Sequence, residues 1–128
     1  MIVLDASVLI AYLDGADTQH GRAEALLLRE ADEDLAASVL TLAEVLVGPV
    51  RAGRAEEVTE ALRDLPIAQL AISSDAAERL AQLRATSGLR MPDCCVILAA
   101  QANGARLATF DGQLGRASAA LGLPTLDE

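Results

Sequence analysis

Short apolar runs alternate with longer amphipathic segments along this chain. The runs at residues 1–5, 34–38, 66–72 and 105–110 have the length of buried β-strands, and residues 124–126 form a candidate edge strand. Segments of helical length separate these runs. Strands that alternate with helices pair in parallel, so the pattern predicts an α/β fold in which helices cover both faces of a parallel β-sheet.

The segments between the runs have the apolar spacing of helices. Gly15 is expected to end the first of them, and Gly48-Pro49 the third. No linker, repeat or low-complexity segment divides the chain, so we expect a single domain over residues 1–128. The predicted helices cover residues 6–15, 18–31, 39–48, 54–65, 73–88, 92–103 and 111–121.

Several of these helices have a predicted inner face. The helix at residues 54–65 is amphipathic, whereas residues 92–103 are apolar almost all round and should be deeply buried. In the helix at residues 73–88, Ser74 or Asp75 is the expected N-cap. The residues of that helix expected to face inward are Ala77, Leu80, Leu83 and Ser87.

The composition adds a strong negative charge and indicates a cellular context. The chain is 52% hydrophobic, and with Tyr12 and Phe110 as its only Tyr or Phe residues and no Trp, its core must be aliphatic. The net charge of −9 gives no basic field for nucleic acid; it suits a site that binds cations or a basic partner protein. Asp5 interrupts the apolar N-terminal run, and the apolar block at residues 35–50 is too short to span a membrane. We therefore expect a soluble cytoplasmic protein.

Adjacent cysteines, Cys94 and Cys95, lie in the apolar segment at residues 92–103. Neighbouring cysteines are badly placed for an unstrained disulfide, and a metal site would need further cysteine or histidine ligands at short spacing. The single histidine, His20, is far away in the sequence and is expected at the surface. We therefore interpret the two cysteines as small buried apolar side chains.

Four acidic residues stand where the local pattern does not require a charge. Asp5 ends the first apolar run, Asp93 stands at the start of the buried helix, and Asp111 follows the fourth strand. Each of these also fits a plainer role as a helix cap or, for Asp111, a turn residue. Glu44 is harder to explain, because a lone carboxylate in an apolar helix is rarely buried without a partner or a cation.

These acids are expected to meet at one edge of the sheet. Parallel strands place their carboxyl ends along the same edge, and ligands of such sheets bind there. Carboxylates about 4 Å apart repel each other by roughly 4 kcal/mol at an effective dielectric constant near 20, so such a cluster requires a cation. Oxygen ligands without histidine or cysteine select Mg²⁺ or Mn²⁺, and a metal site of this kind indicates phosphate chemistry.

The absence of lysine excludes several other phosphate-binding folds. All ten basic residues are arginine, whereas a P-loop needs a lysine in its glycine-rich loop. Receiver domains, which also gather aspartates at strand ends, normally rely on a lysine, and haloacid-dehalogenase-type phosphatases need one as well. A G-x-S-x-G nucleophile elbow is also missing from the sequence.

Four short motifs in a fixed order carry a family resemblance. None is specific alone, but their order and their spread over nearly the whole chain resemble PIN domains, and more narrowly the VapC-type toxins of bacterial type II toxin–antitoxin systems. The resemblance implies a PIN-like three-layer α/β/α sandwich. The motifs are Asp5-x-Ser7, Thr41-x-x-Glu44-x-x-x-Gly48, Asp93 followed by Ala99-Ala100, and Thr109-x-Asp111.

The resemblance implies an endoribonuclease that depends on Mg²⁺ or Mn²⁺ and leaves 5′-phosphate and 3′-hydroxyl ends. Ser7 and Thr109 match small hydroxyl positions beside the family's site, and Thr41 would support the site from the helix that carries the glutamate. Many members have a further acid where this chain has Gln113, so a second metal ion would be held less firmly. The catalytic and metal-binding positions match Asp5, Glu44, Asp93 and Asp111.

The resemblance also implies a homodimer that cleaves RNA and is inhibited by a cognate antitoxin bound in a groove near the site. The apolar helices at residues 6–13 and 39–47 are candidate surfaces for that partner, although the same residues suit core packing equally well. Two other functions stay open: a PIN-like protein-binding module without catalysis, and a metal-dependent phosphoesterase acting on DNA or a small phosphate ester. Intact acids at all four motif positions argue against the first.

Overall fold

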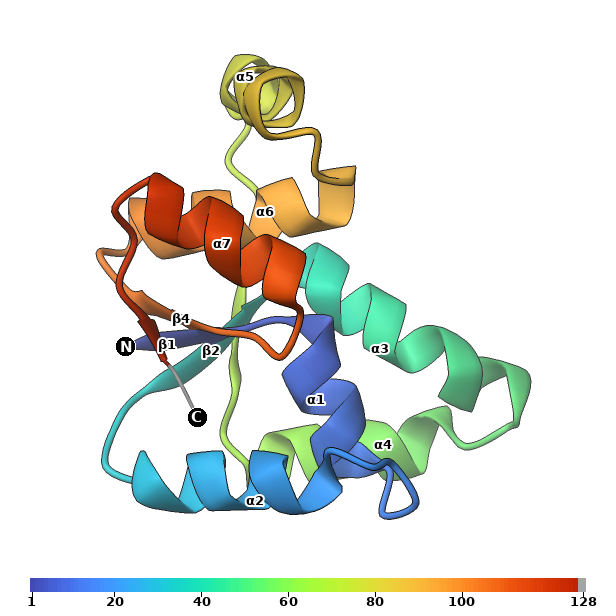
Figure 1. Cartoon of the computed structure of the whole chain (residues 1–128). Helices are drawn as coiled ribbons and strands as arrows, with labels where there is room; N and C mark the ends of the chain where they lie inside the picture. The colour runs from blue at the N-terminus through green and yellow to red at the C-terminus, as the bar shows by residue number, and fades with distance from the viewer. Residues whose placement is uncertain (127–128) are drawn as a thin grey trace.

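A five-stranded parallel β-sheet forms the centre of the molecule (Figure 1). The computed structural model describes residues 1–126. All four neighbouring strand pairs are parallel, which confirms the predicted sheet, including its edge strand near the C-terminus. In the spatial order β3-β2-β1-β4-β5, the strands are β1 (Ile2–Leu4), β2 (Leu35–Ser38), β3 (Ala68–Leu70), β4 (Arg106–Ala108) and β5 (Thr125–Leu126).

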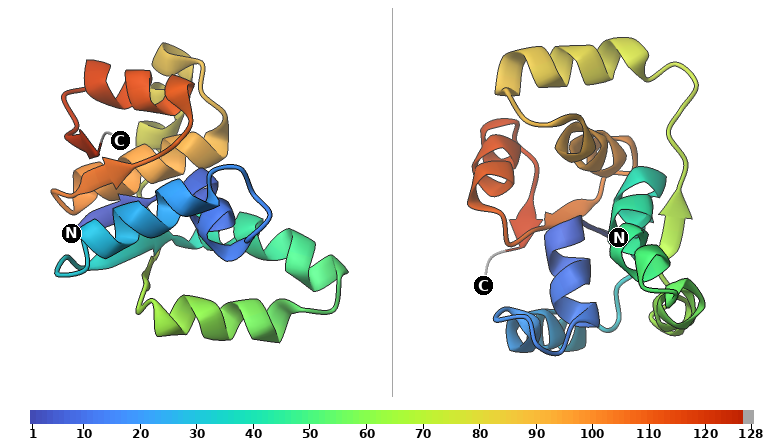
Figure 2. Two further views of the ribbon diagram at one scale, coloured as in Figure 1. Left: turned by 60° about the horizontal axis from the view of Figure 1, so that its bottom comes forward. Right: turned by 90° about the vertical axis from the view of Figure 1, so that its right-hand side faces the viewer.

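Helices cover both faces of the sheet, as predicted. Figure 1 shows α5, α6 and α7 above the sheet and α1, α2 and α4 below it, with α3 at the side. The turned views in Figure 2 show the same division into three layers. The helices are α1 (Ala6–Leu13), α2 (His20–Arg29), α3 (Val39–Arg51), α4 (Ala55–Asp64), α5 (Ala77–Ser87), α6 (Met91–Ala102) and α7 (Gly112–Ala120).

The central strand β1 is buried along its whole length, and its side chains alternate between two cores. Val3 packs with Ile97 of α6 and Leu114 of α7 in one core. Ile2 and Leu4 belong to the other core, which contains residues of α1, α2 and α3. Packing on both faces therefore fixes the position of the residue that follows β1.

α6 passes through the core, as its apolar sequence predicts. Cys94 is fully buried and Cys95 is 4% exposed, and the Cys94 thiol donates to the carbonyl of Leu89 at 3.8 Å. Burial raises the pKa of both thiols, so they stay protonated near neutral pH. The interpretation of the cysteines as buried apolar side chains is confirmed. Within residues 1–126, no helix is both long and apolar enough to cross a membrane.

α3 ends later than predicted. The helix continues through Gly48-Pro49 and reaches Arg51. A proline interrupts a helix by removing one N–H and by crowding the preceding turn, but here it stands close to the end. The next turn still closes, because the amide of Ala52 donates to the carbonyl of Gly48 at 3.0 Å. The predicted stop at Gly48-Pro49 is therefore wrong by about one turn.

α5 begins later than predicted and has no side-chain cap. Its N-cap residue is Ala76, so the predicted caps, Ser74 and Asp75, are both wrong. The hydroxyl of Ser73 donates to the carboxylate of Asp75 within the preceding turn, and this local bond holds the carboxylate away from the helix. The start of α5 is instead fixed by Ala76, which is buried.

The inner face of α5 agrees with the prediction except at its first residue. Leu80 and Leu83 pack against the core, and Ser87 is half-buried. Ala77 is exposed, contrary to the prediction, because the helix only begins there and its first turn lies outside the core.

His20 is not a plain surface residue, contrary to the prediction. Its side chain is 27% exposed, and its Nε2 lies 3.3 Å from a carboxylate oxygen of Glu24. Its Nδ1 lies 2.8 Å from the carbonyl oxygen of Ala11. The ring therefore joins the start of α2 to α1. The sequence pattern gave no signal for this contact, because the partner in α1 is a backbone group.

The packing of α6 leads to a stability prediction. Ile97 is fully buried, so Ile97→Ala should lower the free energy of unfolding by about 2–5 kcal/mol by leaving a cavity against the sheet. Urea unfolding followed by circular dichroism measures this change. Leu28→Ala is the control: Leu28 is 79% exposed, and its truncation should change stability by less than about 0.5 kcal/mol. Equal effects of the two substitutions would contradict the packing of α6.

Candidate active site

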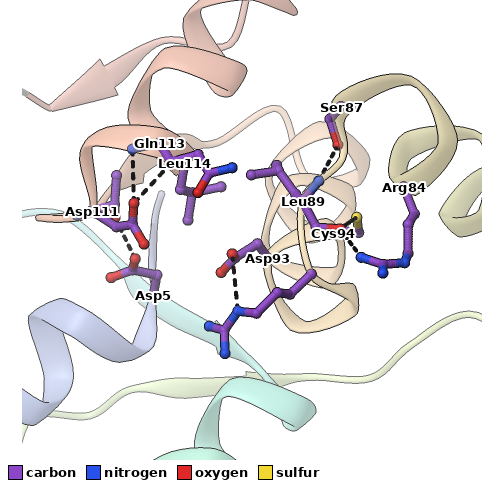
Figure 3. A network of polar contacts seen from close by, with 11 residues as sticks. Asp5, Arg84, Ser87, Leu89, Asp93, Cys94, Asp111, Gln113 and Leu114 are labelled. Atoms are coloured by element: carbon purple, nitrogen blue, oxygen red, sulfur yellow. Dashed lines mark hydrogen bonds and ion pairs between the residues drawn. The ribbon is translucent and has the colours of Figure 1, made fainter.

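The candidate active site lies at the edge of the sheet where β1, β2 and β4 end. Asp5 follows β1 directly, Thr109 follows β4, and the helix that carries Glu44 begins after β2. Asp93 comes from the first turn of α6, and Asp111 precedes α7. Figure 3 shows Asp5, Asp93 and Asp111 around one space, with the carboxylate of Asp93 pointing toward the other two.

Asp5 is the most enclosed of these acids, with 4% of its surface exposed. Its Oδ1 accepts hydrogen bonds from the Ser7 hydroxyl at 2.6 Å and from the Val8 amide at 3.1 Å, and its Oδ2 accepts one from the Thr109 hydroxyl. Burial raises the pKa of this carboxyl, and the three hydrogen bonds oppose the rise. Asp5 is therefore the N-cap of α1, as its plainer explanation predicts, and is also held in one orientation.

The hydroxyls of Ser7 and Thr109 connect the ends of β1 and β4. Their oxygens are 3.5 Å apart, and each donates to the carboxylate of Asp5. The amide of Phe110 donates to the Ser7 oxygen at 2.9 Å, and the amide of Asp111 donates to the Thr109 oxygen at 2.9 Å. Both hydroxyls thus donate a hydrogen bond to Asp5 and accept one from the loop after β4.

Asp93 is not the cap of its helix. α6 begins at Met91 with Arg90 as the N-cap residue, so the capping explanation for Asp93 is wrong. The Nε of Arg90 lies 3.9 Å from Oδ2 of Asp93. Burial raises the pKa of Asp93, the positive charge of Arg90 opposes this rise, and the negative charge of Asp111 adds to it.

Glu44 is half-buried on α3, and its charge interacts with the other acids. Burial raises its pKa, Arg90 opposes the rise, and the charges of Asp93 and Asp5 add to it. Asp93 in turn raises the pKa of Asp5. The structure thus brings three carboxylates from three different elements close enough to repel one another.

Asp111 stands on the outer side of this group. It is exposed, and its Oδ1 accepts hydrogen bonds from the amides of Gln113 at 2.8 Å and Leu114 at 3.2 Å. It is therefore the N-cap of α7 and not the turn residue of its plainer explanation, because Gly112 already begins the helix. Its charge still reaches Asp93, whose pKa it raises. Gln113, where the resemblance expects a further acid, supplies a backbone amide here.

Sequence reasoning did not single out Arg90. Its positive charge opposes the rise that burial causes in the pKa of Glu44 and of Asp93, and its side chain is 73% exposed. The available signal was its spacing, because a cation three residues before Asp93 at a helix start is within reach of that acid. Arg90 is therefore the positive charge inside an otherwise acidic group.

The acids do not yet form a closed metal site. Among residues 1–126, no three acidic, histidine or cysteine side chains converge closely enough to hold one ion. The side chain of Asp93 is paired with Arg90, and one oxygen of Asp111 is used in capping α7. Side-chain rotations at the exposed positions would be needed before a common ion could be bound.

One protein family matches most of the chain, and solved structures share its fold. The family is the PIN domain, matched over residues 2–120. A comparison with curated proteins finds no significant match. A chain in a toxin–antitoxin complex from Klebsiella pneumoniae is 28% identical, with a TM-score of 0.72 and 87% of each chain covered.

Two further structures are less similar in sequence but share the fold. VapC20 from Mycobacterium tuberculosis, described as a toxin that cleaves the sarcin–ricin loop, is 18% identical; its TM-score is 0.77, with 91% of this chain and 95% of that chain covered. FitAcB from Neisseria gonorrhoeae is 24% identical, with a TM-score of 0.75 and coverage of 99% and 97%. Because the family match extends from the first strand to the last helix, this chain belongs to the PIN domain family.

Proposed function

We propose that this protein is a metal-dependent endoribonuclease and the toxin of a toxin–antitoxin pair. The observation that carries the proposal is the group of carboxylates from Asp5, Glu44 and Asp93 at the carboxyl edge of the sheet, where burial raises the pKa of Asp5 and of Glu44 and the charge of Asp93 adds to both rises. Like charges held this close destabilise the fold until a cation joins them. Membership of the PIN family supports nuclease chemistry at this edge.

The residues at this edge fit a hard divalent cation such as Mg²⁺ or Mn²⁺. The candidate ligands are the carboxylate oxygens of Asp5, Glu44, Asp93 and Asp111, with no nitrogen or sulfur among them. Thr41, one turn before Glu44, is buried, and its Oγ1 has no hydrogen-bond partner within residues 1–126. An unpaired buried hydroxyl costs about 1–3 kcal/mol, and a ligand bound beside Glu44 would supply the missing partner.

In this mechanism the chain positions the reacting groups around a phosphodiester. A bound metal supplies charge for a phosphate oxygen and lowers the pKa of a water molecule. Ser7 and Thr109 fix the orientation of Asp5, so this ligand needs no reorganisation when substrate arrives. Arg90 offsets part of the negative charge beside Asp93, which reduces repulsion of the incoming phosphate.

The structural relatives support RNA as the substrate and an antitoxin as the partner. VapC20 is described as a toxin that cleaves the sarcin–ricin loop, and the Klebsiella structure as a toxin–antitoxin complex. These properties belong to those proteins and extend to this chain only through the proposal. The homodimer and the cytoplasmic location stay predictions.

A groove near the acids supports the antitoxin surfaces predicted on α1 and α3. It has a volume of about 430 Å³ between α1, α3 and α4, and apolar side chains such as Ile10 and Val45 line it together with Glu44. Ile10, at the wall of the groove, is 44% exposed. A peptide bound in this groove would cover exposed apolar surface and reach the acidic site at Glu44.

Repulsion among the acids predicts that Asp93→Asn stabilises the metal-free protein. The folded-state pKa of Asp93 is raised, so its ionisation opposes folding at pH 7 and ceases to do so as the pH falls below its ordinary pKa. In EDTA at pH 7 the substitution should therefore raise the free energy of unfolding. The ion pair with Arg90 subtracts little from this gain, because the Arg90 side chain is 73% exposed and its Nε lies 3.9 Å from the carboxylate. Chemical unfolding between pH 3 and pH 8 should show the gain shrinking toward the acidic end.

The same unfolding experiment includes a control substitution, Asp32→Asn, and a second series with Mn²⁺ in place of EDTA. Asp32→Asn removes an equal charge from an exposed position and should leave stability nearly unchanged. Mn²⁺ at about 100 times its dissociation constant should stabilise the wild type by about 2.7 kcal/mol, and Asp93→Asn should lose most of this effect. Equal Mn²⁺ stabilisation of all three proteins would refute a shared metal site.

Cleavage of RNA is the direct test of the function. We expect the wild type to cleave structured RNA with Mg²⁺ or Mn²⁺ and to stop in EDTA. Asp5→Asn and Asp93→Asn should each lower the rate by at least about 100-fold, while Asp32→Asn keeps it, as measured by gel analysis of end-labelled RNA. Activity unchanged by both site substitutions would contradict the proposal. Equal cleavage of DNA of the same sequence would favour a general phosphodiesterase.

The antitoxin surface is tested by a charge placed in the groove. Ile10 is 44% exposed, so Ile10→Glu should leave the fold and RNA cleavage intact but abolish co-purification with the cognate antitoxin. Burial of an unpaired carboxylate in an apolar contact is the physical cause. Leu28→Glu introduces the same charge on α2 and should retain the antitoxin. An antitoxin that binds Ile10→Glu and the wild type equally well would exclude this groove.

A further inference from the structure

A second hollow adjoins the acidic site on its outer side. It has a volume of about 380 Å³, and its lining residues come from the loop after β4, from α7 and from β5. Thr109 and Asp111 line it, so it is continuous with the site described above, and Phe110 between them is part of its wall. Small-ligand sites range from about 300 to 1,000 Å³, so this hollow has room for one nucleotide.

Arg22 of α2 reaches this hollow and stacks on Phe110. Its guanidinium carbon lies 4.4 Å from the centroid of the phenyl ring. Its Nη1 donates to Oε1 of Gln19 at 3.4 Å, which further restricts the guanidinium. Guanidinium planes and aromatic rings are the groups on which proteins stack the bases of single-stranded RNA. The Arg22–Phe110 pair therefore has the chemistry of a base platform.

Arg116 of α7 brings a second guanidinium into the same hollow. Its side chain runs back along the helix to Gly112, where its Nη1 would stand 3.0 Å from a Cβ atom on that residue. Glycine at position 112 thus leaves the space that the guanidinium occupies. Within residues 1–126, Arg116 has no ion pair, whereas Arg54 and Arg106 pair with glutamates. A guanidinium without a carboxylate partner is suited to bind phosphate through two hydrogen bonds.

We propose that this hollow is a nucleotide subsite: it binds the RNA nucleotide next to the scissile phosphate, the base on the Arg22–Phe110 pair and the phosphate on Arg116. The inference rests on the proposed ribonuclease function and extends it by assigning residues that hold the substrate. Arg22 and Arg116 place two positive charges in the hollow, beside the acidic group, in a chain whose net charge is −9. The substrate is then attracted locally, although the protein as a whole repels it.

The contacts of Arg22 also stabilise the fold, so the test must distinguish a loss of stability from a loss of nucleotide binding. Arg22 joins α2 to the loop after β4, so its removal should lower stability whether or not a nucleotide binds. Arg116 is exposed at the surface of α7, and its removal should leave the fold intact. The decisive substitution is therefore Arg116→Ala, and Arg22→Gln is informative only where a thermal melt shows it folded.

The test of binding is a titration with adenosine 5′-monophosphate in EDTA, followed by NMR of the backbone amides. The largest shifts are expected at Phe110, Gly112 and Gly115, and Arg116→Ala should bind about tenfold more weakly. Arg63→Ala, which removes an exposed arginine of α4, is the matched control and should bind as the wild type does. Ribose 5-phosphate, which lacks a base, should bind more weakly than the nucleotide. No binding to the wild type, shifts outside the hollow, or equal affinities of the two variants would overturn the subsite.

Cleavage kinetics separate this inference from the function on which it rests. Arg116→Ala should raise KM for a short RNA with kcat nearly unchanged, and should lower the slope of log affinity against log salt by about 1. Arg63→Ala should change neither. If the wild type binds the nucleotide in the hollow but cleaves no RNA, the ribonuclease proposal fails and the subsite stands. If the wild type cleaves RNA and Arg116→Ala has the same KM as Arg63→Ala and the wild type, the subsite fails.

Discussion

Burial of the Asp5 carboxylate is the constraint on which the arrangement of the site depends. A charge removed from water is costly unless hydrogen bonds or an opposite charge replace the lost water. Three protein donors do so here, and the hydroxyls of Ser7 and Thr109 come from segments that follow different strands. These hydroxyls meet only because β1 and β4 are neighbours in the register that pairs Leu4 with Ala108. The strand order and the hydrogen bonds of one carboxylate therefore depend on each other.

The acidic edge lowers the stability of the metal-free fold, and the two cores must compensate for it. Each fully buried aliphatic side chain, such as Leu4 or Leu107, contributes about 1.5–3 kcal/mol, so a few of them offset the repulsion among the three acids. The chain reduces that repulsion further with Arg90, whose Nε lies 3.9 Å from Asp93. Electrostatic repulsion that persists at one edge of an otherwise well-packed fold is typical of a functional site.

The sequence predicted those features that follow from periodicity and from the geometry of parallel sheets. Alternating apolar runs are required by buried parallel strands, and the shared carboxyl edge placed Asp5 beside the loop after β4. Helix ends were predicted less well, because the effect of Pro49 depends on how close the helix is to its end, and the carboxylate of Asp75 had a nearer partner than the helix. The role of Arg90 and the contact of His20 with α1 depend on spatial neighbours, which periodicity does not describe.

If the proposed ribonuclease function holds, the net charge of this chain is a poor guide to its substrate. At physiological ionic strength the Debye length is about 8 Å, so exposed acids on distant helices hardly affect a phosphate at the sheet edge. That phosphate would meet Arg116 on one side and Arg90 on the other, while a bound cation would neutralise the carboxylates between them. Few phosphates are contacted in such an arrangement, so its affinity should depend less on salt than that of a basic domain that contacts many. On this proposal the affinity for RNA depends on where a few arginines stand relative to four acids, and the sum of all charges says little about it.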